Sequence, residues 1–135
     1  MAEIGNKMRI NVSNAPAAGR ACARIRESEK DLESHLVTGV KARGGLTVKL
    51  TSQFHKGLPD RLVLLPFHTA CFVELKSTGK KRTKLQELAG EQLEALGFRV
   101  FVIDSSELLY DFFQRMDKRI RKIQKLIEDG EVQTA

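Results

Sequence analysis

The chain has 135 residues, of which 41% are hydrophobic and 30% are charged, and its formal net charge is +6. These values exclude a disordered chain and a large multi-domain protein, and they favour one globular domain with a modest core. No apolar run is long enough to cross a membrane, and the first residues lack the apolar stretch of a secretory signal. We therefore expect a cytoplasmic protein without a membrane partner.

The first predicted element is a helix, preceded by an N-terminal arm or tail without periodicity at residues 1–26. Ser28 and Asp31 form a capping pair, and Gly44-Gly45 is typical of a helix end. Three short strands then follow at residues 46–50, 61–65 and 70–76. Short loops join them, which favours an antiparallel meander.

A second helix is predicted at residues 84–96, between a basic loop at 79–83 and a strand at 99–103. A helix between two strands is typical of a crossover, so the fourth strand is expected to run parallel to the third. The core stripe of this helix is expected to comprise Leu85, Leu88, Ala89, Leu93 and Leu96.

Ser105 or Ser106 is expected to cap a last helix that reaches about Glu128. Its apolar residues have heptad-like spacing: Leu109, Phe113, Met116, Ile120, Ile123 and Ile127. This seam can pack on the domain or on a second copy of the chain. The pattern as a whole predicts an α/β fold, with a small mixed β-sheet flanked by helices at residues 27–104 and a basic C-terminal helix and tail at 105–135.

The chemical signal of the sequence is an acid followed, one strand later, by an acid and a lysine. Asp60 opens the second strand, and Glu74-Leu75-Lys76 closes the third. Residues two apart in a strand share a face, and a hairpin turn at residues 66–69 brings Asp60 level with Glu74. Two carboxylates and the Leu75 carbonyl suit Mg²⁺, and Lys76 can orient a water, which is enough for phosphodiester hydrolysis. Taken alone, Glu and Lys on a strand also occur as solubility residues of an edge.

Two further polar residues border the predicted core. Glu33 lies on the apolar stripe of the first helix, where a carboxylate needs a metal or a partner, and the alternative to a metal is an ion pair with Lys30 or Lys41. Gln86 lies in the first turn of the second helix. It can hydrogen-bond a phosphate or a metal-bound water, and the alternative is an ordinary surface glutamine.

Together these residues resemble the VRR-NUC family, a branch of the PD-(D/E)xK nucleases with a restriction-endonuclease-like core. The matching segments are Glu33, residues 48–50, 56–62 and 72–76, Gln86, and residues 97–103. The resemblance implies a Mg²⁺- or Mn²⁺-dependent endonuclease with Asp60, Glu74 and Lys76 as catalytic residues, supported by Glu33 and Gln86. Compact members, which are frequent in bacteriophages and their hosts, look like homodimers that cut branched DNA such as Holliday junctions. The resemblance therefore implies that the protein acts in a bacterial or phage-infected host cell.

The leading hypothesis is therefore a homodimeric, structure-selective DNA endonuclease. No glycine-rich nucleotide loop is present, so no small-molecule cofactor is expected. The cations expected to contact DNA phosphates are Lys49, Lys56, Arg61, Lys80, Lys81, Arg82 and Lys84. The alternatives are a monomeric flap or nicking endonuclease and a non-catalytic DNA-binding module on the same fold. The alternative interpretation of the basic stretches themselves is that they form solvated faces.

Overall fold

The computed structural model describes residues 26–51 and 54–131. Its elements in chain order are α1 (Glu29–Ala42), β1 (Leu46–Lys49), β2 (Arg61–Leu65), β3 (Thr69–Leu75), α2 (Lys84–Ala95), β4 (Arg99–Ile103) and α3 (Ser106–Glu128). The arm predicted at residues 1–26 lies outside these ranges except for its last residue.

The helices begin where short polar side chains cap them. Ser28 precedes α1, and its hydroxyl accepts a hydrogen bond from the Asp31 N–H at 3.1 Å. Thr83 caps α2 and Ser105 caps α3 in the same way. Gly44, with a φ of 74°, follows the C-cap of α1. Each of these contacts satisfies a backbone group that the helix itself leaves unpaired, so the helix boundaries follow from local sequence.

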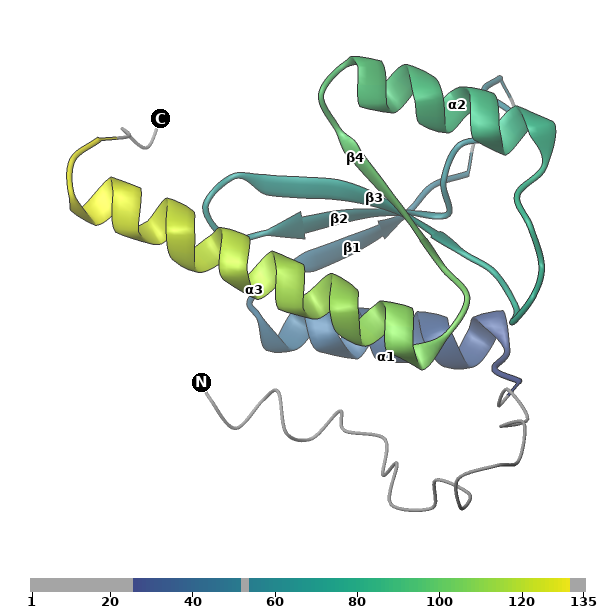
Figure 1. The fold of residues 1–135 in the computed structure, drawn as a ribbon, viewed down its shortest axis with the longest axis horizontal. Coiled ribbons are helices and arrows are strands. Elements are labelled where there is room, and N and C mark those ends of the chain that lie inside the picture. Colours follow the sequence, from purple (N-terminus) through teal and green to yellow (C-terminus); the bar gives the residue numbers. More distant parts are fainter. Residues whose placement is uncertain (1–25, 52–53, 132–135) are drawn as a thin grey trace, which may run out of the picture.

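The four strands form one mixed sheet in the order β1-β2-β3-β4. β1, β2 and β3 are antiparallel neighbours, and β4 runs parallel to β3, which confirms the meander and the crossover. Strand ends differ from the prediction by one residue, at Lys49 and at Thr69–Leu75. Helices α1 and α3 lie on one side of the sheet and α2 lies on the other (Figure 1).

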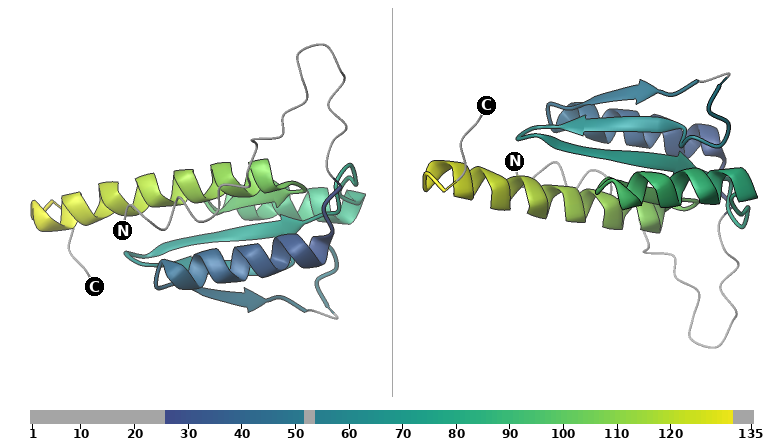
Figure 2. Two further views of the ribbon diagram at one scale, coloured as in Figure 1. Left: turned by 90° about the horizontal axis from the view of Figure 1, so that it is seen from below. Right: turned by 90° about the horizontal axis from the view of Figure 1, so that it is seen from above.

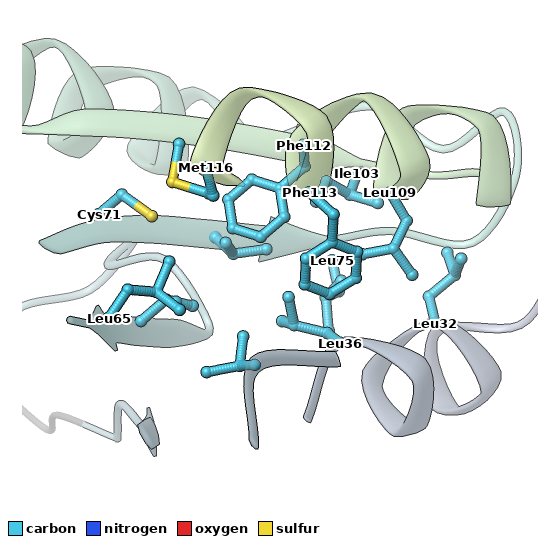
Figure 3. Packing of buried hydrophobic residues seen from close by; sticks show 13 residues of the cluster. Leu32, Leu36, Leu65, Cys71, Leu75, Ile103, Leu109, Phe112, Phe113 and Met116 are labelled. Atoms are coloured by element: carbon cyan, nitrogen blue, oxygen red, sulfur yellow. The ribbon is translucent and has the colours of Figure 1, made fainter. Parts of the chain in front are cut away.

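The hydrophobic core lies between the sheet and the pair α1 and α3 (Figure 3). The first half of α3 contributes four buried residues to it: Leu109, Phe112, Phe113 and Met116. Arg43 and Asp117 join α1 to α3 through an ion pair of 2.7 Å, and the Arg43 guanidinium lies 4.1 Å from the centre of the Phe113 ring. The N-terminal part of the heptad-like seam therefore packs on its own domain. Within the described residues, no helix is long and apolar enough to span a membrane.

The predicted core stripe of α2 is wrong in part. Leu85, Leu88 and Leu96 are 52%, 45% and 74% exposed, whereas Ala89 is buried. The residues that α2 buries are Ala89 and Gly90, which are small enough to let the helix approach the sheet closely. The strand that α2 contacts is chiefly β4, at one edge of the sheet, and the leucines beside this contact remain exposed.

Candidate active site

Asp60 and Glu74 meet where β2 begins and β3 ends. Asp60 directly precedes β2, and its Oδ2 accepts a hydrogen bond from the Leu75 N–H at 2.7 Å. Glu74 is 1% exposed and shares a side-chain hydrogen bond with Asp60. The Asp60 carboxylate is thus anchored to the β3 backbone beside the second acid. The structure brings together the two carboxylates that the hairpin spacing predicts.

Burial raises the pKa of Glu74 to about 8, and the charge of Asp60 and its hydrogen bond act in the same direction. Lys76 and Arg82 partly offset this rise. The Lys76 ammonium lies 3.9 Å from the Glu74 Oε1 and is itself mostly buried. Two facing carboxylates that need a proton to coexist form a strong site for a cation, because a divalent ion can replace that proton. The donor set therefore fits Mg²⁺ or Mn²⁺.

Gln86, on α2, contacts the same oxygen of Glu74 as Lys76 does. Its Nε2 donates to the Glu74 Oε1 at 2.9 Å, while its Oε1 accepts from the Thr83 N–H at 2.9 Å. The capping box of α2 thus fixes the amide so that its donor end faces the acid. Thr83 did not figure among the predicted site residues, although its spacing to Gln86 is the sequence pattern of a capping box.

Gly57 brings the loop before Asp60 onto the first turn of α2. Its φ is 88°, and a Cβ added there would lie 2.4 Å from the Leu85 carbonyl oxygen. Only glycine satisfies both conditions, since a side chain would be strained and would also strike the backbone. This contact sets the distance between the loop that carries Asp60 and the helix that carries Gln86.

Glu33 lies on α1 with its carboxylate paired to the Arg61 guanidinium. This hydrogen bond lowers the pKa of Glu33, with smaller contributions from the charges of Arg61 and Lys49. The ion-pair partner is therefore Arg61, and not Lys30 or Lys41. Among the described residues, no three His, Cys, Asp or Glu side chains group closely enough to hold a metal. A role for Glu33 as a metal ligand remains a prediction.

The predicted DNA-contacting cations differ in their surroundings. Five of them are exposed: Lys49, Lys56, Lys80, Lys81 and Lys84. Arg61 is held by Glu33, and its side chain is only 14% exposed. Arg82 is half-buried and lies against α2, where a Cβ added to Gly90 would come within 2.8 Å of its Nη1. Its charge acts on Glu74, so Arg82 lies nearer the acids than its lysine neighbours suggest.

Comparison with known proteins agrees with this geometry. No family model matches the sequence. The chain is 44% identical over 80 residues to "Putative nuclease p44" of Acyrthosiphon pisum secondary endosymbiont phage 1. The matched segment covers 59% of this chain and 86% of that protein. A solved structure described as a VRR_NUC domain superposes with a TM-score of 0.55 and 28% identity, over 76% of this chain and 97% of the other. The α/β fold of the restriction-endonuclease type is confirmed, and the chain belongs to the VRR-NUC domain family.

Proposed function

We propose that this VRR-NUC endonuclease requires Mg²⁺ or Mn²⁺ and cleaves branched DNA, four-way (Holliday) junctions in particular, as a homodimer. The observation that carries the chemistry is the buried carboxylate pair Asp60 and Glu74, with Lys76 and Gln86 on the Glu74 oxygen. The name of the phage relative, a nuclease, supports hydrolysis of a nucleic acid.

The residues that would hold the cation are Asp60, Glu74 and the backbone carbonyl of Leu75. When bound there, a divalent ion polarises a phosphoryl oxygen and lowers the pKa of a water. Asp60 keeps its place through the Leu75 N–H, and Gln86 keeps the Glu74 carboxylate turned toward the site. Lys76 can donate a hydrogen bond to the attacking water or to a phosphoryl oxygen, and its charge offsets the negative charge that develops during the reaction.

We propose that Arg82 supports the same reaction, because its charge acts on Glu74. Among the described residues no hydrogen bond or ion pair engages its guanidinium, whose Nη1 lies close to Gly90. A guanidinium with free donors binds phosphate oxygens in a bidentate way. We propose that Arg82 contacts the phosphate at or next to the cleaved bond, whereas the exposed Lys80, Lys81 and Lys84 contact flanking phosphates.

Selectivity for branched DNA is proposed from charge and symmetry. A homodimer with a two-fold axis presents two sites to a junction that has approximate two-fold symmetry. Basic residues of the 79–84 segment would then contact two arms, and those of α3 provide further positive charge: Arg115, Lys118, Arg119, Arg121, Lys122 and Lys125. Such contacts make binding strongly salt-dependent.

The test is cleavage of a synthetic four-way junction, a flap and a plain duplex of the same sequence, each with Mg²⁺, Mn²⁺ or EDTA. We expect divalent-ion-dependent cleavage that favours the junction. Asp111→Asn is a suitable control, because Asp111 is an exposed acid on α3. Equal cleavage of junction and duplex would contradict the selectivity, and activity in EDTA would contradict the metal requirement.

A further inference from the structure

One face of the sheet is apolar and largely uncovered. Side chains alternate along strands, so those of Val63, Val73 and Leu75 enter the core while their neighbours point to the opposite side. The strand register aligns the outward residues into two rows across the sheet. One row is Val48, Leu62, Phe72 and Val100, and beside it lie Leu46, Leu64 and Ala70.

Several of these side chains are open to solvent. Leu46 is 60% exposed, Val48 and Leu64 are each 37% exposed, and Phe98, just before β4, is 43% exposed. Seen from above, β1, β2 and β3 lie with no helix over them, since α1 is behind the sheet and α2 is beside it (Figure 2, right). α2 lies on the same side of the sheet (Figure 1), and its Leu85, Leu88 and Leu96 are also exposed.

Seven apolar side chains that are each at least 37% exposed form an open patch, whereas a monomer rarely leaves more than about a few hundred Å² of contiguous apolar surface open. A stable protein–protein interface takes roughly 800 Å² from each partner, with an apolar centre and a polar rim. The exposed side chains can supply such a centre. Both rows consist of apolar residues without a single charge. A flat apolar face can pack on its own copy without electrostatic repulsion, as sheets do in sandwiches.

We infer that two copies of the chain associate through this face, formed by Leu46, Val48, Leu64, Phe98 and the exposed leucines of α2. The inference rests on the proposed homodimeric function and locates its interface.

The seam on α3 is the competing interface, and the structure argues against its N-terminal half. Leu109, Phe113 and Met116 are at most 5% exposed because they fill the core of their own domain. Ile120 also packs against that core. Only Ile123 and Ile127 of the seam remain for a partner, and two partly buried residues cannot supply an interface of the required size.

The location of the interface relates the two active sites to each other. Glu74 points to the same side of β3 as Phe72, and its register partner on β4 is Val102, beside the row that ends at Val100. Two copies packed on this face would therefore have their acids at the margin of the interface. Both sites would belong to one rigid unit, which a substrate with two equivalent branches requires.

The inference is tested by the mass of the intact chain in solution. Leu46 and Leu64 are register partners, so the double variant Leu46→Arg/Leu64→Arg places two adjacent charges on the face. Leu108→Arg is the matched control, because Leu108 is 41% exposed on α3 and lies off this face. Sedimentation equilibrium from 1 to 100 μM gives the dissociation constant, and circular dichroism verifies folding.

We expect a dimer for the wild type and for Leu108→Arg, and a dissociation constant at least a hundredfold weaker for the double variant. A monomeric wild type at 100 μM, or a double variant that remains dimeric, would overturn the inference. Junction cleavage distinguishes this failure from failure of the proposed function. A monomeric double variant with wild-type junction cleavage would leave the interface correct and refute the dimeric mechanism.

Discussion

Replacing Glu74 with glutamine is expected to stabilise the metal-free protein at alkaline pH while abolishing its activity. Glutamine keeps the shape of the side chain and an oxygen that can accept from Gln86, but it never takes a charge. Glu74 is 1% exposed, and its pKa in the folded chain is raised from 4.5 to about 8. Between these values the folded state holds a proton that the unfolded state has released.

The sign and size of the effect follow from this linkage. The contribution of Glu74 to the stability of the wild type is fully present below pH 4.5, falls by about 1.4 kcal/mol per pH unit as the pH rises, and levels off above pH 8. The full change is at most about 5 kcal/mol, and between pH 5.5 and 8 it is roughly 3 kcal/mol. With an m-value of about 1 to 3 kcal/mol/M in urea, this corresponds to a midpoint shift of roughly 1 to 3 M.

Urea unfolding in EDTA at several pH values, for the wild type and Glu74→Gln, measures the difference. Titrating groups far from the site contribute equally to both proteins and cancel. We expect the two curves to agree near pH 5 and to separate as the pH rises, with the variant more stable at pH 8.5. Added Mg²⁺ should restore the wild type at pH 8.5 and leave the variant largely unchanged, since the cation takes the place of the proton. Parallel curves across the pH range would refute the assignment of a buried acid that binds a proton or a metal.

Three further predictions concern residues around the site and the hairpin. Gly57→Ala should lose roughly 1 to 3 kcal/mol of unfolding free energy, measured with urea, and most of the cleavage rate. Gly79→Ala is the control, because Gly79 has a similar φ of 84° but no atom within 4 Å of an added Cβ, so its stability should fall only by the cost of backbone strain. Gly90→Ala should keep its stability, because alanine favours helices, yet its cleavage rate should fall about tenfold because the new methyl group displaces Arg82. If the loss of rate in the double variant with Arg82→Gln equals the sum of the two single losses in free energy, the contact is contradicted. His68→Gly should raise the free energy of unfolding by up to about 1 kcal/mol, since His68 has a φ of 57°, and an unchanged urea midpoint would show that the turn holds no strain.

The proximity of Asp60 and Glu74 could be predicted because it depends on local rules. The turn between β2 and β3 sets the register, and the register brings the residue before β2 to the end of β3, so Asp60 reaches Glu74 without reference to any distant segment. The caps at Ser28 and Ser105 are equally local. These features can be predicted from the sequence because side-chain alternation in strands and hydrogen bonds at helix ends depend on only a few consecutive residues.

Other features depend on which segments meet in space, and the sequence pattern alone could not predict them. Leu85, Leu88 and Leu96 have the spacing of a buried stripe, but the same spacing suits a face reserved for a partner. Glu33 was expected to face a metal or a neighbouring lysine, and its partner Arg61 comes from another strand. The position of Arg82 above Gly90 likewise depends on how closely α2 approaches the sheet.

The most direct test of the central claim is a single-turnover cleavage assay with Asp60→Asn on a synthetic four-way junction. Asparagine can still accept the hydrogen bond from the Leu75 N–H, so the fold is expected to persist while the charge that would hold the cation is lost. We expect the wild type to cut with Mg²⁺ or Mn²⁺ and to be inactive in EDTA. The variant should bind the junction but cut at least a thousandfold more slowly, a loss of about 4 kcal/mol in transition-state stabilisation. Cleavage by Asp60→Asn at the wild-type rate would contradict the assignment of this site.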